Sequence, residues 1–206
     1  MIGGTDTTST MVEWTMTEMI LPPEVMRKSQ EELTTVVGIN NTVEEFHIPK
    51  LEYLNAVVKE TLRLHPAAPL LLPRCPTQSC NVGGYTIPKG TKVFLNVWTM
   101  HRDPEFWDNP YEFRPERFLG DGIKLDYHGN SHHYLPFGAG RRIYAGLPLG
   151  ERMLMHVLAS LLHLFEWKSP NGIEQDSSEN FGVVLEKSTP LRAIPTPRLS
   201  NLELYA

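Results

Sequence analysis

The chain has 206 residues, 41% of them apolar, and is therefore long enough to bury a sizeable core in one or two domains. Its net charge of -5 argues against nucleic-acid binding, which usually needs a basic surface. The two cysteines, Cys75 and Cys80, are too few for a disulfide framework, and the sequence has neither an apolar run long enough for a transmembrane helix nor a signal peptide.

The first third of the chain is predicted to be helical. Residues 2–20 are expected to form a helix that ends at a pair of prolines. A second helix is expected over 24–37, where the following glycine favours a helix end. Apolar residues recur at helical spacing within 50–64, which predicts a third helix that closes just before a proline.

The rest of the chain is predicted to be mixed. Short β-prone runs broken by glycine and proline indicate a hairpin within 81–98, whereas 99–135 is rich in Pro, Asp, Asn and Gly and is expected to be irregular. An apolar helix is predicted over 148–165, and 181–195 is expected to form a closing hairpin. This order of elements favours an α+β fold that is mainly α.

The most specific motif lies at 136–146 and has the sequence Pro-Phe-Gly-Ala-Gly-Arg-Arg-Ile-Tyr-Ala-Gly. It resembles the haem-binding loop of the cytochrome P450 monooxygenases, Phe-Gly-x-Gly-x-Arg-x-Cys-x-Gly, in which the cysteine thiolate binds the haem iron. Tyr144 stands at the position of that cysteine. The resemblance implies that Arg142 pairs with a haem propionate. It also implies that the other matching residues shape the loop against the cofactor, namely Phe137, Gly138, Gly140 and Gly146.

Tyr144 is the candidate axial ligand, because a tyrosinate can bind haem iron, as it does in catalase. A phenol is longer and stiffer than a thiol, however, and it lacks the electron donation that a thiolate supplies. His132 and His133 lie just upstream, but solvated loop histidines are the favoured interpretation of this pair. Cys75 and Cys80 lie far from the loop in sequence and are interpreted as ordinary thiols.

Residues 3–8, Gly-Gly-Thr-Asp-Thr-Thr, resemble the oxygen-activating helix segment of the same family. Small residues there let a helix backbone approach the haem, and an acid beside an alcohol can relay protons. The resemblance implies that Gly4 contacts the haem and that Asp6 and Thr7 deliver protons. Taken alone, a Thr-rich helix start would be the simpler interpretation.

Glu60 and Arg63 are three residues apart and therefore share one face of the third helix. In isolation such a pair is usually solvated and weak. Residues 115–118, Pro-Glu-Arg-Phe, resemble the family segment that supplies a second arginine, here Arg117, to this pair. Since buried charges need partners, the resemblance implies a structural trio that locks the core behind the haem loop.

The segment after the third helix is expected to face the cofactor and the substrate. Arg74 resembles a second contact to a haem propionate. By the same resemblance the substrate side is lined by Ala67, Ala68, Leu70, Leu71 and Val184. The motifs span nearly the whole chain, so residues 1–206 are expected to be the C-terminal portion of a haem-monooxygenase-like domain. The N-terminal half is expected to be absent, with an open apolar face where it would pack.

The resemblance leaves two functions open. One is a haem-dependent monooxygenase, or the haem-side part of one, that hydroxylates a small lipophilic substrate with NADPH electrons from a cytochrome reductase. The other is a non-catalytic remnant that binds haem weakly or not at all. Full-length relatives are expected at the cytosolic face of the endoplasmic reticulum membrane, held by an N-terminal anchor that this chain lacks.

Overall fold

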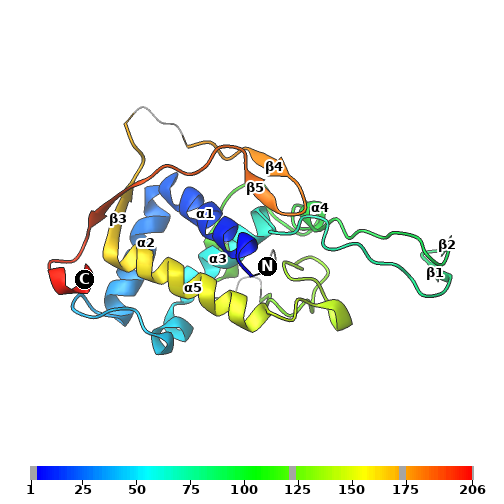
Figure 1. Cartoon of the computed structure of the whole chain (residues 1–206), viewed down its shortest axis with the longest axis horizontal. Coiled ribbons are helices and arrows are strands. Elements are labelled where there is room, and N and C mark those ends of the chain that lie inside the picture. The colour runs from blue at the N-terminus through cyan, green and yellow to red at the C-terminus, as the bar shows by residue number, and fades with distance from the viewer. Residues whose placement is uncertain (1–3, 121–123, 172–174, 206) are drawn as a thin grey trace.

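The computed structural model describes residues 4–120, 124–171 and 175–205. Most of the buried apolar side chains of the core belong to four long helices. The strands form small sheets beside these helices (Figure 1). The fold is therefore mainly helical with small sheets, as the order of elements predicts. The long helices are α1 (Asp6–Ile20), α2 (Pro23–Val36), α3 (Glu52–Leu64) and α5 (Leu147–Leu164).

The core lies between these four helices. Trp14 of α1, Leu33 of α2, Leu54 of α3 and Leu158 of α5 are completely buried. α1 is buried on more than one side, which fits a central helix better than a surface helix with one apolar stripe. Packing of the four helices therefore fixes the position of α1 relative to the start of α5.

Prolines and glycines set the helix boundaries. Pro23 opens α2 at a position where its missing N–H costs no hydrogen bond. Gly38 follows the C-cap of α2 with φ of 85°, a conformation that glycine adopts without strain. α3 ends at Leu64 because the residue before Pro66 is disfavoured in the helical region. These boundaries lie within a few residues of the predicted ones, although residues 2 and 3 of the first predicted helix lie outside the described residues.

Within the described residues, the strands form three separate two-stranded antiparallel sheets. β1 (Cys80–Val82) pairs with β2 (Tyr85–Ile87), β4 (Glu179–Phe181) with β5 (Leu185–Lys187), and β3 (Phe165–Lys168) with β6 (Ile194–Pro197). The β1–β2 hairpin stands out from the rest of the molecule (Figure 1). The short helix α4 (Val97–Met100) occupies the end of the stretch predicted as a hairpin.

The prediction of one closing hairpin over 181–195 is wrong. The hairpin spans 179–187 and turns at Gly182, and the chain then crosses the molecule. Ile194–Pro197 pairs with β3, which directly follows α5. The two prolines in β6 are tolerated because the strand has only one neighbour, so a missing N–H can face away from the ladder.

The C-terminal tail is fastened to the helices by side-chain hydrogen bonds. The guanidinium of Arg198 donates to the carbonyl oxygens of His163 and Gln30, each at 3.0 Å. The Tyr205 hydroxyl donates to the carbonyl of Leu164 at 2.8 Å. We call residues 194–205 the tail clasp, because they connect the end of α5 to α2.

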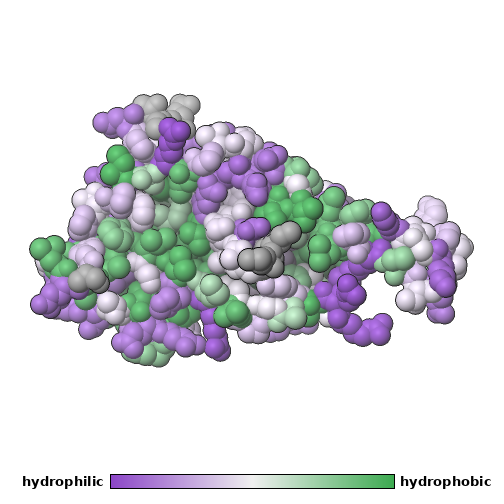
Figure 2. Space-filling model, viewed as in Figure 1, coloured by the Kyte–Doolittle hydropathy of each residue, from purple (hydrophilic) through white to green (hydrophobic). Residues whose placement is uncertain are grey.

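One face of α5 exposes apolar side chains. Leu149, Met153 and Val157 follow one another at i, i+4 spacing and are 65%, 43% and 37% exposed. Figure 2 shows hydrophobic surface along this helix, in the view of Figure 1. None of the helices in the described ranges is both long and apolar enough to cross a membrane.

Candidate functional site

A cavity of about 360 Å³ lies between the start of α1, the segment after α3, the 136–146 loop and the tip of the β4–β5 hairpin. This volume falls within the usual range for small-molecule sites. Most of the residues predicted to face a cofactor or substrate lie on its wall: Thr7, Ala67, Ala68, Leu71, Arg74, Phe137, Gly138, Arg142, Tyr144 and Val184. Leu72, Pro136 and Val183 also line it and were not predicted.

A second, smaller cavity of about 60 Å³ shares Tyr144 and Thr7 with the first. It is lined by Gly4 and Gly146 among others, so both predicted glycines lie beside the site although not on the wall of the larger cavity. Leu149 and Met153 also reach it from α5. The start of α1 and the start of α5 therefore face each other across the Tyr144 ring.

The 136–146 loop is held in a tight turn that places Tyr144 directly before α5. The Tyr144 backbone N–H donates to the Phe137 carbonyl at 3.0 Å, and the Leu147 N–H donates to the Tyr144 carbonyl at 3.2 Å. Gly138 has φ of 79°, which a residue with a side chain would adopt only under strain. The loop geometry thus requires glycine at one of the positions that the motif specifies.

The Tyr144 side chain packs back onto its own loop. A Cβ atom added to Gly146 would lie 2.6 Å from both Cζ and Oη of Tyr144, so only glycine allows the phenol to lie there. The Tyr144 ring lies nearly parallel to Phe137, with 6.2 Å between ring centroids and 16° between planes. The phenol oxygen consequently lies over the start of α5, where the helix dipole favours a negative charge.

Two guanidinium groups, those of Arg74 and Arg142, lie on the wall of the larger cavity. The Arg74 guanidinium lies near Gly138, since a Cβ atom added to Gly138 would lie 3.6 Å from its Nη2 atom. Neither Arg74 nor Arg142 forms an ion pair with a described carboxylate. An apolar cavity with two such cations suits a largely apolar ligand that carries carboxylates.

Three residues predicted to deliver protons or to contact the cofactor or substrate lie away from the walls of both cavities. Asp6 is exposed in the first turn of α1 and accepts a hydrogen bond from the Thr5 hydroxyl at 3.2 Å. Leu70 is half-buried, and its carbonyl accepts a hydrogen bond from the Leu95 N–H. Gly140 opens a short 3-10 helix.

The alternative iron ligands also lie off the cavity walls. His133 is stacked on Phe106, with 3.8 Å between ring centroids, and His132 is exposed. Cys75 and Cys80 are both exposed. In the described part of the chain, no group of three or more His, Cys, Asp or Glu residues could hold a metal ion. Tyr144 is therefore the side chain of these five that reaches the site.

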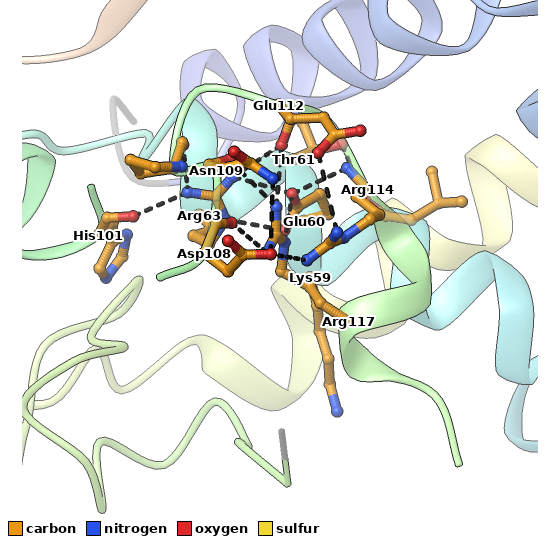
Figure 3. A network of polar contacts seen from close by, with 12 residues as sticks. Lys59, Glu60, Thr61, Arg63, His101, Asp108, Asn109, Glu112, Arg114 and Arg117 are labelled. Carbon is orange, nitrogen blue, oxygen red and sulfur yellow. Dashed lines mark hydrogen bonds and ion pairs between the residues drawn. The ribbon is translucent and has the colours of Figure 1, made fainter. Parts of the chain in front are cut away.

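Glu60, Arg63 and Arg117 form a buried ion-pair network behind the loop (Figure 3). Glu60 Oε2 lies 2.8 Å from Arg63 Nε, and Glu60 Oε1 lies 2.9 Å from Arg117 Nε. The Glu60 and Arg63 side chains are both completely buried, so the solvated-pair interpretation does not hold. Arg63 also donates to the carbonyls of His101 and Pro110, so it connects α3 to the segment 101–110.

Fold, cavity and motifs together define a haem-monooxygenase-like protein, and comparison with known proteins identifies its family. Residues 1–192 match the family described as Cytochrome P450. The chain is 48% identical to a flavonoid 3',5'-hydroxylase of Petunia hybrida, over 98% of this chain and 40% of the relative. It is 50% identical to cytochrome P450 76C2 of Arabidopsis thaliana, over 95% of this chain and 38% of the relative.

A solved structure agrees with the sequence comparison. A zebrafish cytochrome P450, determined with abiraterone, superposes with a TM-score of 0.86 at 34% identity, over 95% of this chain and 46% of that one. The chain belongs to the cytochrome P450 family and resembles plant members. It spans about two fifths of the length of the curated relatives it matches. The family consists of haem-dependent monooxygenases that take NADPH electrons from a reductase.

Proposed function

We propose that the chain is the haem-side part of a haem-dependent monooxygenase that hydroxylates a small lipophilic molecule. The observation that supports this most directly is the apolar cavity whose wall carries Arg74, Arg142 and Tyr144. Arg74 and Arg142 would hold the two haem propionates by charge-assisted hydrogen bonds. Tyr144 would supply an oxygen ligand at the start of α5.

The bound haem would supply the redox chemistry that inserts oxygen into a substrate. Around it, Ala67, Ala68, Leu71 and Val184 exclude water and accept an apolar molecule. The Thr7 hydroxyl lies on the cavity wall, whereas Asp6 is exposed one residue earlier. Thr7 therefore holds the inner position of a proton relay, and Asp6 exchanges protons with water.

The proposal names no substrate narrower than a small lipophilic molecule, because relatives with different names match this chain about equally well. The flavonoid hydroxylase of Petunia hybrida and cytochrome P450 76C2 are 48% and 50% identical to this chain. The rest of the proposal concerns a longer protein of the relatives' length. It receives electrons from a cytochrome reductase and lies at the cytosolic face of the endoplasmic reticulum through an N-terminal anchor.

Titration with haemin tests the proposal. We expect saturable binding that Arg142→Gln and Arg74→Gln each weaken by about tenfold, because each removes one charge-assisted contact. Arg141→Gln is the matched control, since Arg141 is the exposed neighbour of Arg142 and does not line either cavity. The reduced carbon monoxide complex should lack the red-shifted band of a thiolate-ligated haem.

The second candidate is a non-catalytic remnant that binds haem weakly or not at all. Packing of the Tyr144 phenol against Gly146 favours it, because a loop shaped around that contact would have to open to bring the oxygen to iron. A folded chain, judged by circular dichroism, that shows no saturable haemin binding would support the remnant. A red-shifted carbon monoxide band at full haem occupancy would contradict both ligation by Tyr144 and the non-binding remnant. It would point to Cys75 or Cys80 as the iron ligand.

A further inference from the structure

His65 lies at the end of α3, next to but not on the cavity wall, and both of its ring nitrogens contact carboxylates. Nε2 lies 2.9 Å from Glu18 Oε1 of α1, and Nδ1 lies 2.9 Å from Glu179 Oε1 of β4. The three side chains are only 7%, 11% and 19% exposed. The imidazole also stacks on Trp14, with 3.8 Å between ring centroids and 4° between planes.

The geometry determines the protonation of the ring. An ionised carboxylate only accepts hydrogen bonds, and a neutral imidazole has one donor and one acceptor nitrogen. To serve Glu18 and Glu179 together, His65 must carry protons on both nitrogens. Removing that charge would cost one of the two carboxylates its hydrogen bond from His65 in a mostly buried place, which is unfavourable.

Glu179 connects the β4–β5 hairpin to the segment that contains Trp98 and Arg102. Its Oε2 atom accepts from Trp98 Nε1 at 2.8 Å, and its Oε1 atom lies 3.2 Å from Arg102 Nη2. Burial would raise the pKa of Glu179, but the hydrogen bonds from His65 and Trp98 outweigh it and the pKa lies below its usual value. Lys187 of β5 also lies near the cluster, with its ammonium 4.9 Å from the Trp14 ring centroid.

The cluster holds two walls of the cavity at once. Ala67, two residues after His65, lines the cavity and accepts a hydrogen bond from the Leu185 N–H at 3.1 Å. Trp14 donates through its indole to the Leu185 carbonyl at 2.9 Å. The tip of the same hairpin places Val183 and Val184 on the cavity wall.

We infer that doubly protonated His65, bridging Glu18 and Glu179, is a positioning residue that holds the β4–β5 hairpin against α1 and thereby sets the substrate side of the cavity. This inference goes beyond haem binding, since none of the three residues lines the cavity. It can therefore be tested on the chain without any ligand.

Hydrogen exchange of the unliganded chain tests the positioning role. His65→Phe keeps a ring against Trp14 but removes both donors, and we expect amides in 179–187 to exchange at least about tenfold faster. His163→Phe is the control, because His163 is buried like His65 but lies on α5 and bonds to the Asn41 carbonyl. The inference is overturned if hydrogen exchange in 179–187 speeds up no more in His65→Phe than in His163→Phe. It is also overturned if exchange in the helices of His65→Phe speeds up as much as exchange in the hairpin.

A second pair of variants tests whether the carboxylate that contacts His65 matters more than another carboxylate of the same hairpin. Glu179→Gln should speed exchange in 179–187, whereas Glu186→Gln, an exposed change on the partner strand, should not. Equal exchange in the two variants counts against the inference.

A third test uses the native chain and therefore does not depend on whether a variant folds. Nitrogen-15 spectra of labelled histidine should show protons on both His65 ring nitrogens at pH 7. A ring with one unprotonated nitrogen overturns the inference. Because these measurements use no haemin, their outcome is independent of whether the chain binds haem.

Discussion

Tyr144 determines which chemistry the site can support. Tyr144→Cys should raise haemin affinity, because it places a thiol, which the helix dipole helps to ionise, at the position that the family's loop uses for its iron ligand. We expect a gain of at least about tenfold, equivalent to about 1.4 kcal/mol, in a haemin titration. The reduced carbon monoxide complex of the variant should then show the thiolate-type band.

Tyr144→Phe is the matched control, since it removes only the hydroxyl and retains the ring packed near Phe137. If Tyr144 binds iron, the phenylalanine variant should hold haemin more weakly than the native chain. Equal haemin retention by the native chain and Tyr144→Cys would show that the loop no longer supports an axial ligand.

Glu60 is the acceptor for two arginines in a dry part of the core. Glu60→Ala should lower the free energy of unfolding by about 3–5 kcal/mol, because Arg63 and Arg117 remain as buried, uncompensated charges. Denaturant unfolding measures this loss. Glu31→Ala is the control, since Glu31 pairs with Arg27 in solvent at 62% exposure and should cost at most about 0.5 kcal/mol. A loss for Glu60→Ala as small as for the control would contradict the prediction.

Motif spacing predicted individual residues best where the motif is contiguous. The 136–146 loop brings Phe137, Gly138, Arg142 and Tyr144 to one cavity, because a short turn has few conformations once its glycines are placed. The His65 cluster could not be predicted in this way. Its members come from distant parts of the chain, and only packing of three separate elements, α1, α3 and β4, brings them together.

At the scale of elements, α1 and α5 meet across the Tyr144 ring. Added haemin should therefore protect both 4–20 and 147–164 from hydrogen exchange, because a ligand stabilises what it contacts in the folded state. α2 lies away from the cavities and serves as the internal control. Protection confined to α5 would mean that the chain does not build a two-sided pocket, and the proton relay proposed for Thr7 and Asp6 would be abandoned.

Elements with local signals were predicted well, and those that depend on distant partners were not. α2, α3 and α5 were predicted to within a few residues, because their ends carry prolines or glycines and their apolar residues follow helical spacing. The pairing of β3 with β6 was missed, since nothing in either short strand identifies its partner. Short strands take their register from the surface on which they pack.

At the scale of the whole molecule, a buried histidine makes the fold sensitive to acid. His101 Nε2 accepts a hydrogen bond from the Leu135 N–H, so Nδ1 carries the proton, and Nδ1 has no partner among the described residues. Burial, together with the positive charge of Arg63, lowers the pKa of His101 from 6.5 to about 3.

The sign of the effect follows from proton binding. Between pH 6.5 and about 3 the unfolded chain binds a proton at His101 that the folded chain excludes, so stability falls as pH falls through this window. His101→Gln should remove this contribution and reduce the slope by up to about 1.4 kcal/mol per pH unit. Denaturant unfolding across this range measures the slope. His128→Gln, in an exposed loop, should leave it nearly unchanged, and an unaltered slope in His101→Gln would count against the assignment.

The tail clasp has a kinetic consequence. The Arg198 guanidinium bridges two helices, because it donates to the carbonyls of His163 in α5 and Gln30 in α2, and both helices must be packed before one side chain can reach both. The clasp should therefore close after the helical core, so weakening Arg198 or Tyr205 would shorten the lifetime of the folded chain and leave its folding rate nearly unchanged.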